Sequence, residues 1–286
     1  MISAINKLPD GTIELAITVP WKRVHNSYQK TLTDLTQKSQ LKGFRKGKAP
    51  KKIVEEQLGK SAIYEEVLKT LVPHVYVEAV KEQKIKPIVN PQIKVISLEE
   101  KKDWQIQATT CELPQVKLED YKGEVKKALA AEKIWVPGKD EEKTKTDQTT
   151  QEQRMQKVFA TLLKTVKVQI PAILIQQEVE RMLSRLIDQT SRLGLTVEQY
   201  LASIGKTSDQ LRTEYRQQAE ESLKLELVLS KIADDQKVEI KEEEVEKMIK
   251  ATPDEKTRKG LDTPAQRAYI RQLLRKRAVV DFLSKL

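Results

Sequence analysis

Residues 43–50 read Gly43-Phe44-Arg45-Lys46-Gly47-Lys48-Ala49-Pro50. Two glycines and a proline within eight positions interrupt both a regular helix and a strand, so this stretch predicts a tight, projecting loop. Between Leu35 and Val54 the sequence has seven lysines and arginines and no acidic residue. Phe44 stands among these cations without a periodic apolar partner. A loop tip that carries an aromatic ring and a guanidinium suits docking on an anionic partner.

The same loop has a simpler interpretation. Runs of charge are most often solvated surface, so the loop could be an ordinary basic turn whose Phe44 packs into its own domain. The eight residues taken as a unit favour docking instead, because the pattern G-F-R-K-G-K-x-P resembles the ribosome-docking signature of trigger factor. Trigger factor is a family of bacterial chaperones that sit at the exit of the nascent chain.

The resemblance implies a role for each residue of the loop. In that family the loop contacts a protein of the large ribosomal subunit and nearby rRNA at the mouth of the exit tunnel. Carried over residue by residue, the docking side chains are Phe44, Arg45 and Lys46, and the loop is shaped by Gly43 and Gly47. The remaining matching positions of the ribosome-binding set are Lys48 and Pro50.

Composition narrows the class of protein. The 286 residues leave room for two domains. Charged residues make up 33% of the chain and aromatic residues only 5%, a composition that predicts a helix-rich chain with a thin core. No window approaches the ~20 apolar residues that span a bilayer, so we expect no membrane partner. The first residues lack the pattern of a secretion signal, and the single Cys111 fits a reducing compartment. Together these features predict a cytoplasmic protein.

The first part of the chain predicts a small α+β domain over residues 1–114. A turn at Leu8–Thr12 separates two strands, the second of which alternates apolar and polar residues over 13–19. Helices follow on either side of the loop, and two more strands are expected around 92–97 and 102–112. This order resembles the ribosome-binding domain of the family over its whole length.

Residues 115–150 predict a linker, since 139–150 are nearly devoid of apolar side chains. Most trigger factors carry an FKBP-like peptidyl-prolyl isomerase domain at this place. The span from Tyr121 to Gln169 has only 49 residues here, both ends included, whereas a separate domain is typically on the order of 100 residues. We therefore expect the isomerase domain to be missing, whether by nature or by deletion.

Residues 151–286 predict an all-α domain with extended helical arms, the chaperone domain that the resemblance implies. Most apolar residues of its helices must form helix–helix contacts. A chaperone also needs shallow, exposed apolar side chains that hold unfolded segments loosely. The positions suggested for such client binding are Met248, Ile249, Tyr269 and Leu273.

Catalysis is not expected. The sequence shows no phosphate-binding glycine loop after a strand, no C-x-x-C pattern and no nucleophile elbow. No catalytic residue, cofactor or metal ligand is therefore predicted, and the protein is not expected to be an enzyme.

The hypothesis from sequence is an ATP-independent chaperone that docks on the large ribosomal subunit and shelters nascent or unfolded polypeptides. One alternative is a basic nucleic-acid-binding protein, since the last 31 residues carry nine basic and two acidic groups, with Arg267, Arg271 and Arg275 on one helix face. Another is an exported chaperone of the periplasmic helical type. Whether the free protein forms a homodimer stays open.

Overall fold

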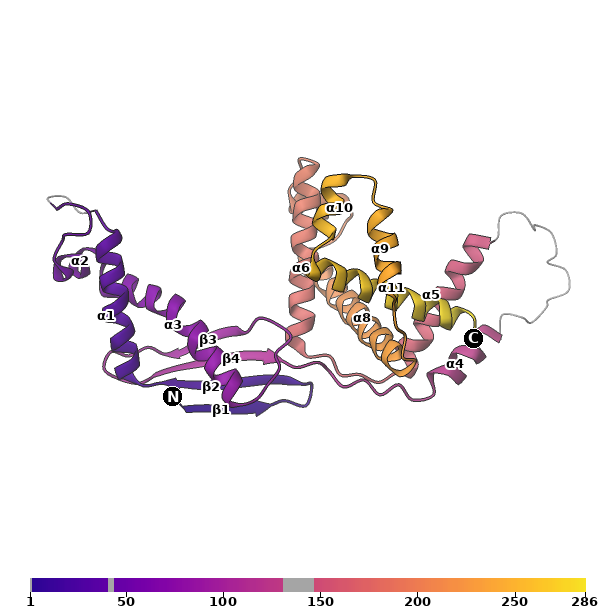
Figure 1. Cartoon of the computed structure of the whole chain (residues 1–286), viewed down its shortest axis with the longest axis horizontal. Coiled ribbons are helices and arrows are strands. Elements are labelled where there is room, and N and C mark those ends of the chain that lie inside the picture. Colours follow the sequence, from indigo (N-terminus) through magenta and orange to yellow (C-terminus); the bar gives the residue numbers. More distant parts are fainter. Residues whose placement is uncertain (1, 41–43, 131–146) are drawn as a thin grey trace. The chain divides into compact units, whose positions relative to one another are not determined.

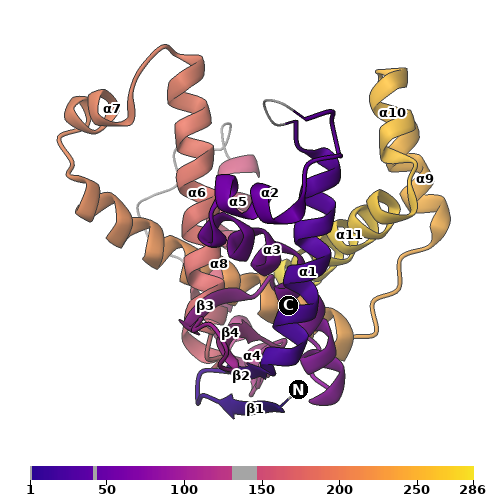
Figure 2. The same cartoon turned by 90° about the vertical axis from the view of Figure 1, so that its left-hand side faces the viewer.

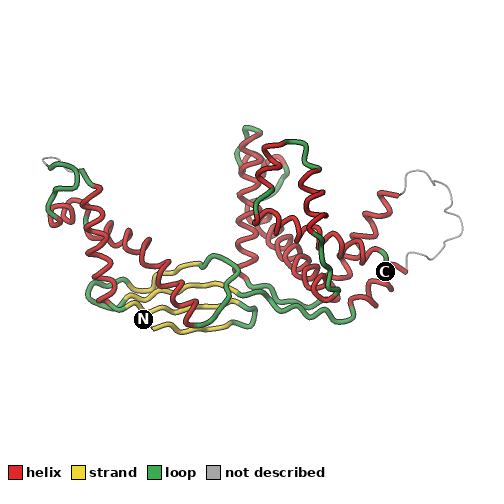
Figure 3. The backbone as a smooth tube through the Cα atoms, viewed as in Figure 1, coloured by secondary structure: helices red, strands yellow, loops and turns green. Residues whose placement is uncertain are grey.

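The computed structural model describes residues 2–40, 44–130 and 147–286. The chain divides into two compact units, one formed by Met1–Leu113 with Pro171–Leu174, the other by Pro114–Ile170 with Ile175–Leu286. The first unit is an α+β domain and the second is all-α, as predicted (Figure 1, Figure 3).

The first unit contains a four-stranded antiparallel sheet in the order β1-β2-β4-β3. The strands are β1 (Ile2–Lys7), β2 (Thr12–Val19), β3 (Gln92–Ser97) and β4 (Trp104–Cys111). A tight turn joins β1 to β2, where Gly11 takes a φ of 87° and the Asp10 carboxylate accepts the Thr12 N–H at 3.0 Å. The turn lies where the sequence predicts it, β2, β3 and β4 lie within two residues of their predicted positions, and β1 is the strand expected before the turn.

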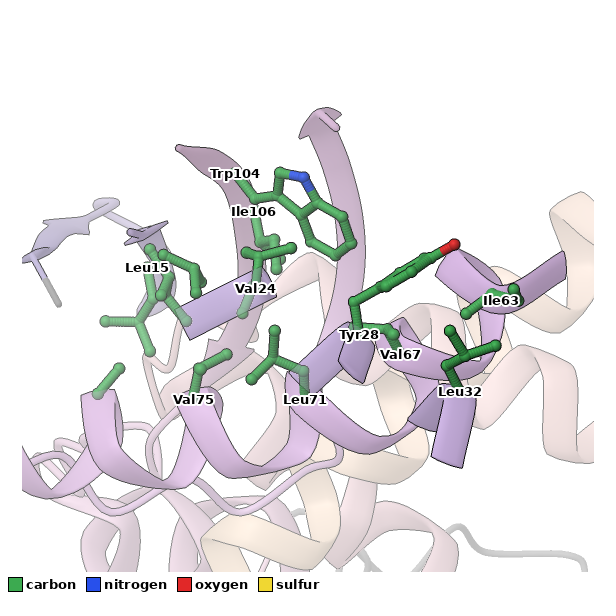
Figure 4. Close-up of a cluster of buried hydrophobic side chains, with 14 of the residues drawn as sticks. Leu15, Val24, Tyr28, Leu32, Ile63, Val67, Leu71, Val75, Trp104 and Ile106 are labelled. Atoms are coloured by element: carbon green, nitrogen blue, oxygen red, sulfur yellow. The ribbon is translucent and has the colours of Figure 1, made fainter. Parts of the chain in front are cut away.

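Three helices complete the domain: α1 (Trp21–Lys38), α2 (Lys51–Leu58) and α3 (Lys60–Glu82). Alternate residues of β2 point to the helices, so Leu15 and Val19 are buried together with Ile106 and Trp104 of β4. Figure 4 shows Leu15, Trp104 and Ile106 beside Val24 and Tyr28 of α1 and Val67, Leu71 and Val75 of α3. The shared core holds α1 and α3, and hence the loop that follows α1, on a rigid sheet.

The second unit consists of helices. These are α4 (Tyr121–Ala130), α5 (Asp147–Thr165), α6 (Ala172–Arg192), α7 (Val197–Ser203), α8 (Ser208–Asp235), α9 (Glu242–Lys250), α10 (Glu255–Leu261) and α11 (Pro264–Ser284). Thr196 and Thr207 form capping boxes that start α7 and α8, and Thr263 caps α11 ahead of a proline in its first turn.

Apolar packing in this unit is split into three clusters rather than one core. The largest, which we call the bundle, joins α4, α5 and the C-terminal halves of α8 and α11. Arm 1 (residues 183–215) has a small core of Leu186, Leu201 and Leu211, and arm 2 (residues 240–274) has one of Val245, Ile249 and Ile270. Figure 2 shows α6 with α7 and α9 with α10 as separate helical pairs. Small cores of this kind leave much of each arm's surface in solvent.

The expected linker over residues 115–150 is partly wrong. Residues 121–130 form α4, whose Tyr121, Val125 and Leu129 are buried in the bundle, and the next helix already begins at Asp147. Val125 and Leu129 lie four residues apart on one helix face, and they pack against α5, α8 and α11. The chain divides after Leu113, and Pro171–Leu174, which the prediction assigns to the helical domain, groups with the first unit. The polar stretch 131–146 lies outside the described residues.

Candidate functional site

The loop between α1 and α2 is closed at its base by backbone contacts. Helix α1 ends when Ser39 takes an extended conformation, and the Gly47 N–H then donates to the Ser39 carbonyl at 3.2 Å. A turn follows in which the Lys48 N–H donates to the Arg45 carbonyl at 2.9 Å. These bonds bring the two ends of the loop together and leave Arg45 and Lys46 at its turn.

Gly47 is required by this geometry. Its φ of 76° is one that L side chains rarely adopt, and a Cβ at this position would lie 3.1 Å from the Gln37 carbonyl oxygen. The next anchor is Ala49, which is buried in the core of the domain, and Pro50 then precedes the first turn of α2. The Lys51 ammonium donates to the Thr33 hydroxyl of α1 at 2.7 Å and ties the start of α2 to α1.

The side chains of the loop tip face solvent. Phe44 is 37% exposed and is not part of the core of its domain, and Arg45, Lys46 and Lys48 are exposed as well. None of these three cations forms an ion pair with another residue in the described part of the chain. The Phe44 side chain is thus partly covered by its own domain and partly open to solvent. Gly43, the first residue of the predicted set, lies outside the described residues.

Helix α2 is held to the domain by a polar contact as well as by apolar ones. The Tyr28 hydroxyl of α1 donates to the Glu55 carboxylate of α2 at 2.8 Å, and burial raises the pKa of Tyr28. The ring centroids of Tyr28 and Tyr64 lie 4.9 Å apart, and the Tyr64 ring packs edge-on against Trp104 with 5.5 Å between their centroids. This aromatic series links the segment after the loop to the sheet, so the loop is mounted on a rigid frame.

Three of the four residues suggested for client binding are exposed. On arm 2, Met248 is 39%, Leu273 44% and Tyr269 64% exposed. Ile249 is buried, so its predicted exposure is wrong. It lies four residues after Val245 on α9, and both side chains pack against Ile270 of α11.

Arm 1 carries exposed apolar residues that sequence reasoning missed. Ile187 of α6 is exposed, and so is Leu193, which directly follows the helix and is 74% exposed. Leu195 and Ile204, on either side of α7, are exposed too. The signal in the sequence was the turn at Gly194, whose φ is 71°, because apolar side chains that flank a helix stop have no neighbouring turn to cover them.

The arginine face of α11 is paired with acidic groups rather than free. Arg267 bonds to Glu242 at 2.5 Å and to Asp262 at 2.6 Å, and Arg271 bonds to the second oxygen of Glu242. Arg275 pairs with Asp234 at 2.8 Å. These ion pairs lie at the surface, and they neutralise part of the positive charge that a nucleic-acid stripe would need.

The described residues offer neither a metal site nor a membrane-spanning helix. Over residues 2–40, 44–130 and 147–286, no cluster of three or more His, Cys, Asp or Glu could hold a metal ion. No helix in these same ranges combines the length and apolar content needed to cross a bilayer. Cys111 is buried, and burial raises the pKa of its thiol to about 11, in keeping with a packing residue.

Two family models match this chain, one over its N-terminal half and one over its C-terminal half. A family model described as bacterial trigger factor protein matches residues 1–146, and one described as the bacterial trigger factor C-terminus matches residues 139–285. The chain belongs to the trigger factor family. The loop at 43–50 falls within the N-terminal trigger factor match, and both arms fall within the C-terminal one.

Curated trigger factors resemble this chain over part of its length. Those of Staphylococcus aureus strains JH9 and Newman are 38% identical over 109 residues, which is 38% of this chain and 25% of theirs. The chain thus covers a quarter of the length of these relatives. The trigger factor models for the N- and C-terminal parts overlap at residues 139–146, so no interval separates them in this sequence.

A solved structure shows the same fold. It is described as "Promiscuous Substrate Recognition in Folding and Assembly Activities of the Trigger Factor Chaperone", and it matches with a TM-score of 0.68 over 100% of this chain and 99% of that one. The sequence identity is 13%, so the likeness establishes the fold of a trigger factor and nothing finer.

Proposed function

We propose that the protein is a ribosome-associated, ATP-independent chaperone of the trigger factor family that acts in the cytoplasm. The loop at 43–50 docks it beside the nascent-chain exit, on a protein and rRNA of the large subunit. The observation that carries this proposal is the loop's geometry: exposed Phe44 and three cations without an ion-pair partner among the described residues, Arg45, Lys46 and Lys48, lie beside a base fixed by Gly47 and Ala49. A preformed cationic tip meets a polyanion with little loss of conformational freedom.

The arms supply the client-binding surface in this proposal. Both arms expose apolar side chains, among them Leu193 after α6, Met248 on α9, and Tyr269 and Leu273 on α11. Each gives a weak contact that demands no particular sequence, and several together hold an unfolded segment with rapid release. Such binding needs no nucleotide.

We infer further that the chain has no prolyl isomerase activity. The support is the overlap of the two trigger factor family models, which leaves no interval for an isomerase domain in the usual place. A turnover assay on a prolyl peptide should give the uncatalysed rate.

Two measurements test the function. In the first, the chain is added without nucleotide to an unfolded protein diluted from denaturant, and light scattering reports aggregation. We expect suppression that added ATP does not change. In the second, the chain is pelleted with ribosomes at low and high salt, and we expect co-sedimentation that salt weakens. Tight binding to naked RNA or DNA without suppression of aggregation would favour the nucleic-acid-binding alternative instead.

A further inference from the structure

Strand β3 forms an open edge of the sheet. It pairs with β4 on one side, and no other strand among the described residues pairs with it on the other. Residues 92–96 are all exposed, and the outer N–H and C=O groups of the strand have no backbone partner in the described structure. An edge of this kind is a template on which another extended chain can pair.

Exposed apolar side chains are densest around this edge. Five large ones fall within residues 88–98, more than in any other stretch of eleven described residues: Ile88, Ile93, Val95, Ile96 and Leu98. Ile93 and Val95 lie opposite Ala108 and Ile106 of β4, so they share the face that the helices cover further inside the sheet. At the edge the helices no longer cover them.

The usual protections of an edge strand are weak here. Lys94 is the one charged residue of β3, and an irregularity between Val95 and Ser97 leaves Ile96 without an opposite residue on β4. Residues 92–95 remain in regular register. Ile96, 52% exposed, adds an apolar contact beside this regular part.

We propose that the outer edge of β3 binds an extended, apolar segment of a client polypeptide as an additional strand. This inference rests on the proposed chaperone function and adds to it a second mode of client binding, away from the arms. Main-chain hydrogen bonds supply affinity that does not depend on client sequence, while Ile93, Val95 and Ile96 favour apolar segments. Such pairing suits a chaperone with varied clients.

Charge decides between a client and a second copy of the chain. The protein carries a net charge of +10, and Lys94 has no ion-pair partner among the described residues. Antiparallel pairing of two β3 strands would bring the Lys94 side chains close together, which is unfavourable. A neutral or acidic client segment meets no such repulsion.

The first test separates main-chain pairing from apolar contact. The full chain is titrated into a fluorescein-labelled twelve-residue peptide of alternating valine and threonine flanked by glutamates, with anisotropy as the readout. Two matched peptides carry N-methyl groups on alternate amides, and each blocks a different edge of the peptide strand. We expect the peptide whose pairing edge is blocked to bind about tenfold more weakly or worse, because N-methylation removes hydrogen bonds and keeps the side chains. Equal affinity for all three peptides would overturn the inference.

The second test locates the peptide by amide hydrogen exchange. We expect the peptide to slow exchange within residues 92–97, and Ile96→Lys to remove most of that protection. The matched control is Ile88→Lys, which places the same charge at an equally exposed position outside the strand and should keep the protection.

The outcomes distinguish this inference from the function on which it rests. If the peptide protects only the arms, the edge inference fails and the chaperone proposal stands. If the peptide does not bind and aggregation is not suppressed, the chaperone proposal itself fails. If protection of residues 92–97 rises with protein concentration in the absence of peptide, a second copy occupies the edge and the client assignment is wrong.

Discussion

The Gly47 N–H donates to the carbonyl oxygen of Ser39 at 3.2 Å, and this bond joins the start and the end of the loop where helix α1 ends. Gly47 adopts a φ of 76° here, and a Cβ at this position would lie 3.1 Å from the Gln37 carbonyl oxygen. If the loop docks on the ribosome as we propose, its glycine should matter for binding as well as its cations.

Gly47→Ala tests this dependence. The strained φ and the close Gln37 oxygen should lower the free energy of unfolding by about 1–2 kcal/mol and weaken ribosome binding, although every docking side chain is retained. Urea denaturation and ribosome pelleting measure the two effects. The control is Gly260→Ala in α10, where a Cβ meets nothing within 4 Å. It should keep ribosome binding unchanged and should not lower the free energy of unfolding, since alanine favours a helix more than glycine does. Ribosome binding at the original level in Gly47→Ala would contradict a preformed loop.

Ionisation of Tyr121 should lower the stability of the bundle at alkaline pH. Burial, and then the charge of Asp235, raise the pKa of Tyr121 to about 12, whereas an unfolded tyrosine titrates near 10. Because the pKa of Tyr121 is higher in the folded than in the unfolded protein, folding favours the neutral hydroxyl. The full stabilisation is present below about pH 10 and is lost as the pH rises towards 12.

Tyr121→Phe should remove this contribution. We expect its unfolding free energy, measured with urea and circular dichroism, to fall less between pH 9 and pH 11.5 than that of the unaltered chain. Lysine titration affects both proteins and cancels in the comparison. Equal losses in the two proteins would show that the Tyr121 hydroxyl titrates in the folded protein as it does in the unfolded one.

Glu242 joins α9 to α11 through Arg267 and Arg271, and bonds from Arg271 and then Arg267 lower its pKa. Because the pKa of Glu242 is lower in the folded protein, its ion pairs stabilise the fold above the usual pKa of a glutamate. This stabilisation is lost as the pH falls through the pKa of Glu242 in the folded protein.

Loss of the ion pairs should loosen α9. Glu242→Gln should therefore speed amide exchange in α9 at neutral pH, and high salt should do the same in the unaltered chain. The neighbouring Glu243→Gln, exposed on the same helix, should leave exchange in α9 unchanged.

Two adjacent residues of α9 should respond in opposite ways to truncation. Ile249→Ala removes a buried side chain from the small core of arm 2 and should destabilise that arm by about 2–4 kcal/mol. Met248→Ala removes an exposed one, so it should leave stability unchanged and weaken suppression of aggregation. Limited proteolysis of arm 2 and light scattering report the two effects. Early cleavage in Met248→Ala would contradict its assignment to the surface.

Local patterns predicted the first domain closely. The alternation in residues 13–19, the turn before it and the proline and glycines of the loop act over a few residues, so strands, turn and loop follow from the sequence itself. The exposure of Phe44 followed from the lack of an apolar partner nearby. The resemblance to trigger factor, confirmed by both family models, also rested on this local stretch.

Features that depend on distant partners were missed. A helix repeat shows that Val245 and Ile249 share a face, and only the position of α11 shows that Ile270 covers it. The pairing of Arg267 and Arg271 with Glu242, 25 and 29 residues away, depends on the same helix contact. Helix α4 was taken for linker because its three buried residues gain their partners from α5, α8 and α11.

We propose that the tip of the loop tethers the chain to the ribosome. The most direct test is the affinity of a triple variant of this tip for ribosomes. Phe44→Ala, Arg45→Ala and Lys46→Ala together remove one apolar side chain and two cations. The matched control removes the same kinds of group from α6: Arg185→Ala, Ile187→Ala and Arg192→Ala.

In ribosome pelleting at low salt, we expect the loop variant to remain in the supernatant while the α6 variant pellets like the unaltered chain. The slope of log affinity against log salt should also fall in the loop variant, by roughly one for each cation removed. Unchanged pelleting of the loop variant, or an equal loss in the two variants, would contradict the claim.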